Sequence, residues 1–304
     1  MSPSLPDRPA RQPGKHYSTP QTGRAQRGCA ILLAVMAVRL DDIGPLKPVL
    51  DRRPLGLATD IDGTLSPIVD APDTAVVTPL CRRYLQEISR RVEVVAAISG
   101  REPGVARRLV GLEEVVYIGN HGLSWWRQGR EETLAEAVPY ETMVRQAKKD
   151  LAVRLDLPGL LLEDKGPILA LHYRRCADRQ AARVAILDAL APWTTQGLRI
   201  REGRLVFELS PPLDVHKGTA LIHLMETYRL SGILYLGDDL TDVDAFKVLR
   251  HWREEGKVSG VAVAVANPES APEVMEEADY WVDGVPGVEW LLAAIASVVA
   301  GKRP

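Results

Sequence analysis

Five short apolar runs, separated by helical segments, constrain the fold of this 304-residue chain most strongly. Two of these helical segments, residues 78–91 and 217–230, show the helical pattern clearly. Residues 78–91 predict a helix that Thr78 caps and that has Pro79 in its first turn, and residues 217–230 predict another with one apolar face. The apolar runs are LGLAT (55–59), VEVVAAI (92–98), VVYIG (115–119), GILYLG (232–237) and VAVAVA (261–266). Strands of this kind alternating with helices predict an α/β fold, in which a parallel sheet is covered on both faces.

Residues 123–207 have a different pattern, which predicts an α+β domain inserted into the α/β core. The core then consists of residues 46–122 and 208–304. The inserted segment predicts a hairpin at 123–134, helices at 136–157 and 178–191, two strands around Lys165-Gly166-Pro167, and a hairpin that turns at Glu202-Gly203.

Residues 1–45 predict a disordered or weakly structured extension, because residues 1–28 are rich in Pro, Arg, Gln, Gly and Ser. The apolar run Cys29–Val38 that follows is too short for a bilayer span, which needs roughly 20 residues. A signal-peptide core remains an alternative to a docking helix or a misassigned start, although no small-x-small cleavage site follows.

The overall charge and the cysteines narrow the classes of function. With 38 basic and 40 acidic residues, the formal net charge of −2 creates no field that would attract nucleic acid or an anionic membrane. The three cysteines are far apart and form no C-x-x-C pair, so neither a disulfide framework nor a zinc site is indicated. These features predict a cytoplasmic protein without a nucleic-acid or membrane partner.

Acidic residues follow two of the predicted strands. Asp60 and Asp62 come directly after the first run, and side chains two apart in an extended segment share a face. Asp238 and Asp239 follow the fourth run, and Asp242 lies a short distance beyond. In α/β folds the ligand crevice lies at the carboxyl ends of the strands, so these groups are expected to meet there. Clustered carboxylates repel each other, and Mg²⁺ is the oxygen-ligated cation that suits a phosphate site.

Each of these motifs has a structural alternative. Asp62 could simply form an Asx-type turn before Gly63, and Thr241 is expected to cap the helix that follows Asp239, with Asp244 three residues on. In that case the negative charge of Asp242 would only interact favourably with the positive end of the helix dipole.

Two further groups predict a phosphate-binding site. Ser99 and Gly100 follow the second run, where a hydroxyl and free amides could hold a phosphate oxygen. Lys217 opens a predicted helix, so its ammonium group and the positive helix end both favour an anion. The alternatives are an ordinary turn, a solvated lysine, and a structural ion pair for the neighbouring Arg101.

The order of these motifs resembles the haloacid dehalogenase superfamily of phosphohydrolases: DxDGT, a strand-end Ser, a helix-start Lys, and GDDxxD. The resemblance implies a Rossmann-like core with a parallel sheet and a C2-type cap as the inserted α+β domain. It implies Asp60 as the nucleophile, Asp62 as the general acid and base, and Mg²⁺ held by Asp60, the Asp62 carbonyl and Asp238. Ser99 and Lys217 would hold the phosphoryl group, with Asp239 and Asp242 in support.

From residue 52 to residue 292 the chain resembles the trehalose-6-phosphate phosphatases within that superfamily. The segments that carry the resemblance are YIGNHGL, EDKGPILALHYR, KGTAL and GDDLTDVDAF. It implies hydrolysis of a sugar phosphate in trehalose biosynthesis and functional pairing with a trehalose-phosphate synthase. The substrate-binding residues that it implies are Arg101, Asn120, His121, Glu163, Lys165, Arg174 and Glu208. Ser210, Ser124 and Val243 depart from the family pattern, where Arg, Glu and an acidic residue are usual.

Two other functions remain open at the level of sequence. The chain could hydrolyse another sugar phosphate, such as sucrose phosphate, glucosylglycerol phosphate or a glycosylated phosphoglycerate. It could also be a receiver-like module that is phosphorylated on Asp60 and signals through a change of shape. The large inserted domain and the second aspartate, Asp62, argue against a receiver.

Overall fold

The computed structural model describes residues 36–69, 72–203, 205–268 and 270–301, and in this part of the chain the strands form two sheets. The larger sheet has nine strands in the order β1-β13-β12-β11-β2-β3-β4-β5-β6, and the neighbouring pairs from β1 to β4 are parallel. Its strands are β1 (Val38–Arg39), β2 (Leu55–Thr59), β3 (Val94–Ile98), β4 (Val116–Gly119), β5 (Ser124–Arg127), β6 (Arg130–Thr133), β11 (Gly232–Gly237), β12 (Ser259–Ala266) and β13 (Tyr280–Asp283). The five predicted apolar runs are therefore neighbouring strands, which confirms the α/β fold.

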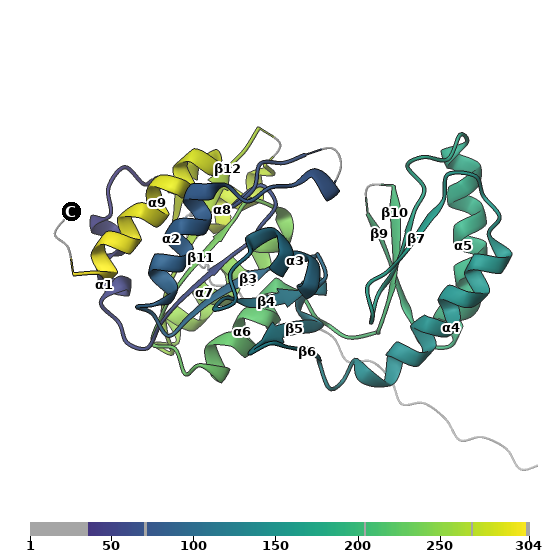
Figure 1. The fold of residues 1–304 in the computed structure, drawn as a ribbon, viewed down its shortest axis with the longest axis horizontal. Helices are drawn as coiled ribbons and strands as arrows, with labels where there is room; N and C mark the ends of the chain where they lie inside the picture. The colour runs from purple at the N-terminus through teal and green to yellow at the C-terminus, as the bar shows by residue number, and fades with distance from the viewer. Residues whose placement is uncertain (1–35, 70–71, 204, 269, 302–304) are drawn as a thin grey trace, which may run out of the picture. The chain divides into compact units, whose positions relative to one another are not determined.

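Helices cover both faces of the nine-stranded sheet (Figure 1). On one face lie α1 (Lys47–Leu50), α2 (Pro79–Ser89), α3 (Pro103–Val110) and α9 (Gly284–Val299). On the other lie α6 (Lys217–Thr227), α7 (Leu240–Glu254) and α8 (Pro272–Glu277). The predicted cap of α2 is confirmed, since the Thr78 side chain accepts a hydrogen bond from the Cys81 amide.

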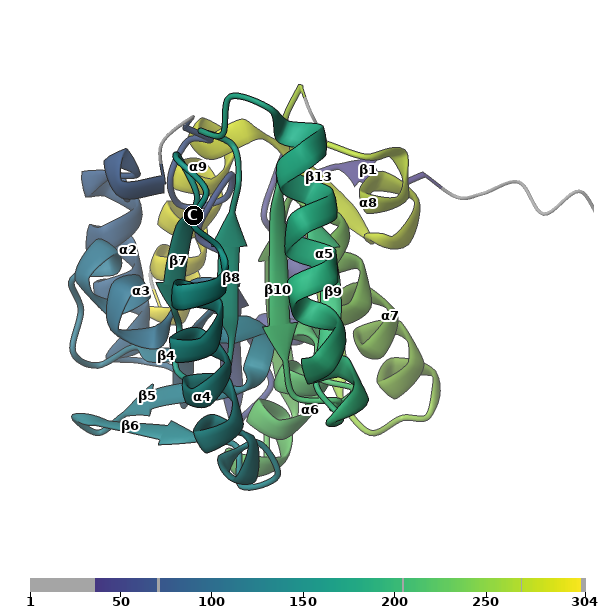
Figure 2. The same ribbon diagram turned by 90° about the vertical axis from the view of Figure 1, so that its right-hand side faces the viewer.

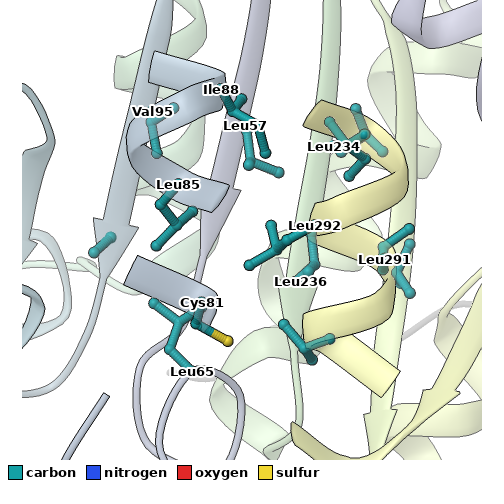
Figure 3. Close-up of a cluster of buried hydrophobic side chains, with 14 of the residues drawn as sticks. Leu57, Leu65, Cys81, Leu85, Ile88, Val95, Leu234, Leu236, Leu291 and Leu292 are labelled. Atoms are coloured by element: carbon teal, nitrogen blue, oxygen red, sulfur yellow. The ribbon is translucent and has the colours of Figure 1, made fainter. Parts of the chain in front are cut away.

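The core under α2 and α9 shows why the central strands are apolar throughout (Figure 3). Leu57 of β2 and Leu234 of β11 pack with Leu85 of α2 and Leu292 of α9, and each of these four side chains is at most 1% exposed. Burying a side chain of this size stabilises the fold by about 1.5–3 kcal/mol. Such a core holds β2 and β11 rigidly side by side, and both strands end at the candidate site.

The segment before β2 is more ordered than the sequence suggested. Residues 36–45 were expected in a weakly structured extension, but β1 pairs with β13, and η1 (Gly44–Leu46) and α1 follow it. Leu40, Ile43 and Leu46 are buried in the core, which explains the ordering. The rest of the predicted extension, including residues 29–35 of the apolar run, lies outside the described residues.

The smaller sheet has the order β7-β8-β10-β9, and all its pairs are antiparallel. Figure 2 shows α4 and α5 in front of these strands. Leu169, Leu171, Phe207 and Leu209 point toward the helices, so the alternate residues of β8 and β10 lie on the opposite face. The elements are α4 (Val138–Arg154), β7 (Leu161–Asp164), β8 (Leu169–His172), α5 (Arg179–Thr195), β9 (Arg199–Gly203) and β10 (Val206–Ser210).

The sheet membership changes the expected boundaries of the inserted domain. The hairpin β5–β6 was expected inside residues 123–207, but β5 pairs with β4 and so extends the larger sheet. At the other end, β10 continues past residue 207 to Ser210 within the smaller sheet. We therefore propose that the inserted domain extends from residue 134 to residue 210.

A membrane-spanning segment would need a long, apolar helix, and the described residues contain no helix of that kind.

Candidate active site

The acidic residues after β2 and β11 meet at the carboxyl edge of the larger sheet. These strands are paired, and the Asp60 amide donates a hydrogen bond to the Leu236 carbonyl at 2.8 Å. Asp60, Asp238 and Asp242 are buried, and each offers a carboxylate oxygen within 4.8 Å of those of the other two. The carboxylates of residues 60 and 238 are thus brought together as the sequence predicted.

Lys217 lies among these carboxylates at the start of α6. His216 caps this helix: its Nδ1 accepts from the Gly218 amide, and its own amide donates to Thr219 Oγ1. The Lys217 Nζ lies 3.0 Å from Asp60 Oδ1 and 2.7 Å from Asp242 Oδ1. Burial alone would lower the pKa of Lys217, but the carboxylates of Asp242 and Asp60 outweigh it and raise the pKa. The lysine is therefore a fixed positive charge.

Asp242 is saturated by hydrogen-bond donors. Its Oδ1 accepts from Lys217 Nζ and from the Tyr235 hydroxyl, each at 2.7 Å, and its Oδ2 accepts from the amides of Asp238 and Asp239 at 3.1 and 3.0 Å. A carboxylate has about four lone-pair sites. Asp242 therefore positions Lys217 and the turn after β11, and it has no oxygen to spare for a cation.

The helix α7 begins differently from the sequence expectation. Thr241 was expected as the N-cap, but the helix begins at Leu240 and Asp239 is the N-cap residue. The Asp239 side chain accepts from the Leu240 amide at 2.6 Å, while the Asp242 side chain accepts from the Asp239 amide, which completes a capping box. The early start is what brings the Asp242 carboxylate back under the end of β11.

Asp238 is held by residues that the sequence analysis did not single out. Thr64 Oγ1 donates to its Oδ1 at 3.1 Å, and Asn267 Nδ2 donates to its Oδ2 at 3.1 Å and to the Gly63 carbonyl at 2.9 Å. Asn267 directly follows β12, so the strand-edge argument could have found it. Gly63 has φ +83° and a Cβ there would lie 1.9 Å from Asp238 Oδ2, which explains the glycine of the DxDGT motif.

The electrostatics of the cluster fit a divalent cation. Burial raises the pKa of Asp60 well above its ordinary value, and the nearby Asp242 and Asp238 add to the effect against the opposing charge of Lys217. Burial, and then Asp242, raises the pKa of Asp238 to about 7. Both shifts express the cost of placing like charges together away from water, and a cation between Asp60 and Asp238 would remove that cost. Buried carboxylate oxygens are the donors that Mg²⁺ prefers.

Asp62 and Arg101 form a close ion pair at the edge of the cluster. Arg101 Nε and Nη2 donate to the two oxygens of Asp62 at 2.6 and 2.7 Å. The Ser99 hydroxyl, which is buried, accepts from the Arg101 amide at 3.2 Å. The ion pair that the sequence offered as an alternative role for Arg101 is present, and Asp62, Ser99 and Arg101 all line the same cleft.

A cleft of about 560 Å³ extends from the acidic cluster to the helix-free face of the smaller sheet. On that face Lys165 Nζ lies 3.1 Å from Glu208 Oε1 and 3.9 Å from Glu163 Oε2. His172 Nε2 lies 2.8 Å from Glu163 Oε2, and this hydrogen bond lowers the pKa of Glu163. Strand alternation explains why Glu163, His172 and Glu208 face the cleft together, and His172 is a lining residue that the sequence analysis did not single out.

The remaining sequence candidates take different positions. His121 and Asp239 line the cleft with the residues above. Asn120 is 1% exposed and is not among the described residues that line the cleft. Arg174 is exposed in the turn after β8 and does not belong to the described lining either. Ser124 and Ser210, the departures from the family pattern, also lie outside the described lining.

The fold and the site match the haloacid dehalogenase-type arrangement that the sequence motifs implied. The sequence pattern named trehalose-phosphatase matches residues 58–285, most of the chain. The chain belongs to the trehalose-phosphatase family.

Individual relatives agree with this assignment. Trehalose-phosphate phosphatase of Mycobacterium tuberculosis (strain H37Rv) is 32% identical over an alignment of 233 residues, and the match covers 70% of this chain and 58% of the relative. The chain thus spans less than two thirds of the length of such relatives.

Two solved structures share the fold. The crystal structure of a trehalose-6-phosphate phosphatase related protein has a TM-score of 0.65 at 20% identity, over 82% of this chain and 100% of that one. The C-terminal domain of the C. albicans trehalose-6-phosphate phosphatase has a TM-score of 0.63 at 22% identity, over 86% of this chain and 99% of that one.

Proposed function

We propose that this protein is a Mg²⁺-dependent phosphatase that hydrolyses trehalose 6-phosphate to trehalose and phosphate. The observation that carries the proposal is the position of Lys217, 3.0 Å from Asp60 and beside Asp238, at the end of a cleft lined also by Glu163, Lys165 and Glu208. One end of the cleft suits a phosphoryl group and the other suits sugar hydroxyls. The family membership supports the same substrate.

In the first step, Asp60 attacks phosphorus, and the bond between phosphorus and the sugar oxygen breaks. The product is an aspartyl phosphate on Asp60 and an alcohol, so the reaction is split into two easier displacements. Lys217 and the Ser99 hydroxyl hold the phosphoryl oxygens, a type of electrostatic contribution often worth about 3 kcal/mol per donor. Mg²⁺, held by Asp60, Asp238 and the main-chain carbonyl of Asp62, would offset the repulsion between the phosphate and the carboxylates.

Asp62 moves the proton in both steps. It protonates the departing sugar oxygen, and then takes a proton from the water that attacks the aspartyl phosphate and restores Asp60. In the structure, Arg101 binds both oxygens of Asp62. Proton transfer therefore requires this ion pair to open, and we place that opening at substrate binding, because Arg101 lines the cleft and can turn to the phosphate.

The inserted domain recognises the disaccharide in this proposal. Glu163 and Glu208 accept hydrogen bonds from sugar hydroxyls, and Lys165, 12% exposed between them, donates. Charged hydrogen-bond partners of this kind discriminate between sugars, because a sugar without a hydroxyl at the required position leaves a charged group of the site without a partner.

The proposed reaction also implies a setting. The substrate must be supplied by a glycosyl-transfer reaction, and we propose pairing with a trehalose-phosphate synthase on that ground. The described cysteines, Cys81 and Cys176, are free and buried, which supports the proposed location in the reducing cytoplasm.

A phosphate-release screen with Mg²⁺ tests the proposal. The purified protein is expected to release phosphate fastest from trehalose 6-phosphate in a panel that includes sucrose phosphate, glucosylglycerol phosphate and glucose 6-phosphate, and EDTA should stop the release. Faster release from another sugar phosphate would replace the proposed substrate. Stable phosphorylation of Asp60 without release would instead identify a receiver-like module.

A further inference from the structure

The turn η3 (Asn120–Gly122), directly after β4, has an unusual backbone, and we call it the coupling turn. Asn120, His121 and Gly122 have φ values of 52°, 60° and 122°. Asparagine and glycine tolerate this left-handed region better than most residues do, but a run of such residues persists only where its surroundings hold it. The contacts of the coupling turn therefore indicate what it serves.

On one side, the coupling turn is hydrogen-bonded to the loop that carries Ser99. The Asn120 amide donates to the Arg101 carbonyl at 2.9 Å, and the His121 amide donates to the Ser99 carbonyl at 3.1 Å. Gly100 lies between these two bonds, where a Cβ would be 2.8 Å from the His121 ring. The position of the Ser99 hydroxyl therefore depends on the coupling turn.

On a second side, the coupling turn packs against the beginning of α6. A Cβ on Gly122 would lie 2.9 Å from Val215 Cγ1 and 3.1 Å from Ala220 Cβ. These two residues flank Lys217 in the sequence, so the coupling turn contacts the segment that sets the position of the lysine. Both proposed phosphoryl-binding groups are thus supported by the same three residues.

On the third side, the coupling turn reaches the inserted domain. Asn120 Nδ2 donates to the main-chain carbonyl of Lys165 at 2.9 Å and to Ser124 Oγ at 3.2 Å. The Lys165 carbonyl can only accept, so the amide nitrogen must face it. The Oδ1 atom of Asn120 is buried and has no hydrogen-bond partner among the described residues. An unpartnered buried acceptor costs free energy, which shows that the bond to Lys165 dictates how this side chain is oriented.

We propose that Asn120 is a positioning residue, which transmits engagement of the inserted domain with the sugar to the phosphoryl-binding groups Ser99 and Lys217. When Lys165 engages the sugar phosphate, its main chain holds Asn120, and the coupling turn holds the Ser99 loop and the start of α6. This inference rests on the proposed function, since it assumes that Lys165 binds the sugar part of the substrate.

The first experiment compares two substrates in two Asn120 variants. Asn120→Gly removes the amide but accepts the left-handed backbone, and Asn120→Asp keeps the shape but cannot donate to Lys165. In both variants, kcat/KM for trehalose 6-phosphate should fall about 3- to 10-fold more than kcat/KM for p-nitrophenyl phosphate, the range expected for one hydrogen bond. Ser124→Ala, which removes the other acceptor of the same Nδ2, should keep the wild-type ratio of the two substrates.

The second experiment is a double-mutant cycle with Lys165→Ala, which removes the sugar contact but keeps the carbonyl. In that background Asn120→Gly should cost less than about 2-fold in kcat/KM for trehalose 6-phosphate, because the two changes interrupt the same coupling. If Asn120→Gly does not fold, Asn120→Asp is used in the cycle.

Three outcomes would overturn the inference: equal losses on both substrates, a loss in Ser124→Ala that matches that of the Asn120 variants, or an undiminished loss in the Lys165→Ala background. These outcomes are distinct from failure of the proposed function, which would appear as absence of phosphate release from trehalose 6-phosphate by the wild-type protein.

Discussion

Lys217 reduces the electrostatic repulsion among the carboxylates of the metal-free acidic cluster. Its ammonium group contacts Asp60 and Asp242 in a site where Asp238 is also buried, so one positive charge faces three carboxyl groups. The residual repulsion appears in the raised pKa values of Asp60 and Asp238. A buried site with this imbalance is suited to receive a divalent cation together with a phosphate group.

Replacing Asp60 tests the proposed covalent step directly. Asp60→Asn has almost the same volume but lacks the nucleophilic carboxylate, so turnover of both trehalose 6-phosphate and p-nitrophenyl phosphate should be abolished. Phosphate release is the measurement, and circular dichroism should show a folded protein. Appreciable activity of a folded variant would contradict the role of Asp60 as nucleophile.

Asp242→Asn tests whether this residue positions the others. An amide offers a donor where four donors already converge, so the variant should lose about 3–5 kcal/mol of unfolding free energy, as when one partner of a buried ion pair is removed. Denaturant unfolding measures the loss. The neighbouring Asp239→Asn is the matched control and should cost about 1 kcal/mol or less, the range for an N-cap change. Equal stabilities of the two variants would show that Asp242 is not the buried anchor.

The sequence predicted the site residues at the ends of strands better than the residues that position them through hydrogen bonds. Asp60, Asp238, Ser99 and Lys217 follow or begin regular elements, so the fold class brings them to one edge. The four-donor arrangement of Asp242 depends on the N-cap of α7, which the sequence analysis placed at Thr241 and the structure places at Asp239. Asn267 acts through partners far away in the sequence, at Gly63 and Asp238, and single-sequence patterns do not show such pairs. His172 contacts Glu163 of the neighbouring strand, so finding it required the register of β7 and β8.

At the level of elements, the alternation of the inserted sheet separates its two faces. Glu163 lies on the face toward the cleft, whereas Glu202 pairs with Arg183 of α5. Glu163→Ala should therefore reduce kcat/KM for trehalose 6-phosphate by about 10-fold or more, the effect of losing a charged hydrogen bond, and should affect p-nitrophenyl phosphate far less. Glu202→Ala is the matched control with a near wild-type ratio. Equal losses on both substrates would argue against recognition by the inserted domain.

His121 of the coupling turn should make the unfolding free energy of the protein depend on pH. Burial lowers the pKa of His121 to about 4, whereas the unfolded chain has the ordinary value of about 6.5. Between these pH values the unfolded state binds more protons than the folded state. The contribution of neutral His121 to the unfolding free energy is therefore complete above pH 6.5 and is lost as the pH falls toward 4. The expected loss is on the order of 2–3 kcal/mol.

The measurement is the unfolding free energy of wild type and of His121→Asn between pH 4 and pH 7. Asparagine tolerates the positive φ of this position and does not titrate there. The difference between the two proteins isolates His121 from the carboxyl groups that titrate in the same range. A constant difference would contradict the lowered pKa.

The elements themselves were predicted unevenly, for identifiable reasons. The five central strands have long apolar runs, and the helices of the inserted domain, expected at 136–157 and 178–191, are found at Val138–Arg154 and Arg179–Thr195. The hairpin β5–β6 was recognised as a hairpin, but nothing in its sequence indicates that it joins β4 and not the inserted sheet. β1 has two residues, too few for a period, and its order comes from pairing with β13 and from the burial of Leu40 and Ile43.

For the whole molecule, Mg²⁺ should stabilise the folded state. At a concentration of 100 times its Kd, a ligand that binds only the folded chain adds about 2.7 kcal/mol, which corresponds to several degrees in Tm. The effect should be larger at pH 8 than at pH 6, because the metal-free protein holds a proton on Asp238 below its pKa of about 7 and Mg²⁺ must displace it.

Thermal unfolding with Mg²⁺ or with EDTA at the two pH values measures this effect. Asp238→Asn is the control and should lose most of the response to Mg²⁺. A response that is the same at both pH values, or that survives in Asp238→Asn, would place the cation elsewhere.

The pairing of β2 with β11 has a consequence for biosynthesis. Asp60 leaves the ribosome before the strand to which its amide is bonded, because that strand, β11, is made only after the inserted domain has been translated. A nascent or truncated chain that ends before β11 contains Asp60 but lacks the strand that positions it. The candidate site is therefore completed only once β11 has been made, and a fragment that ends before β11 lacks a complete site.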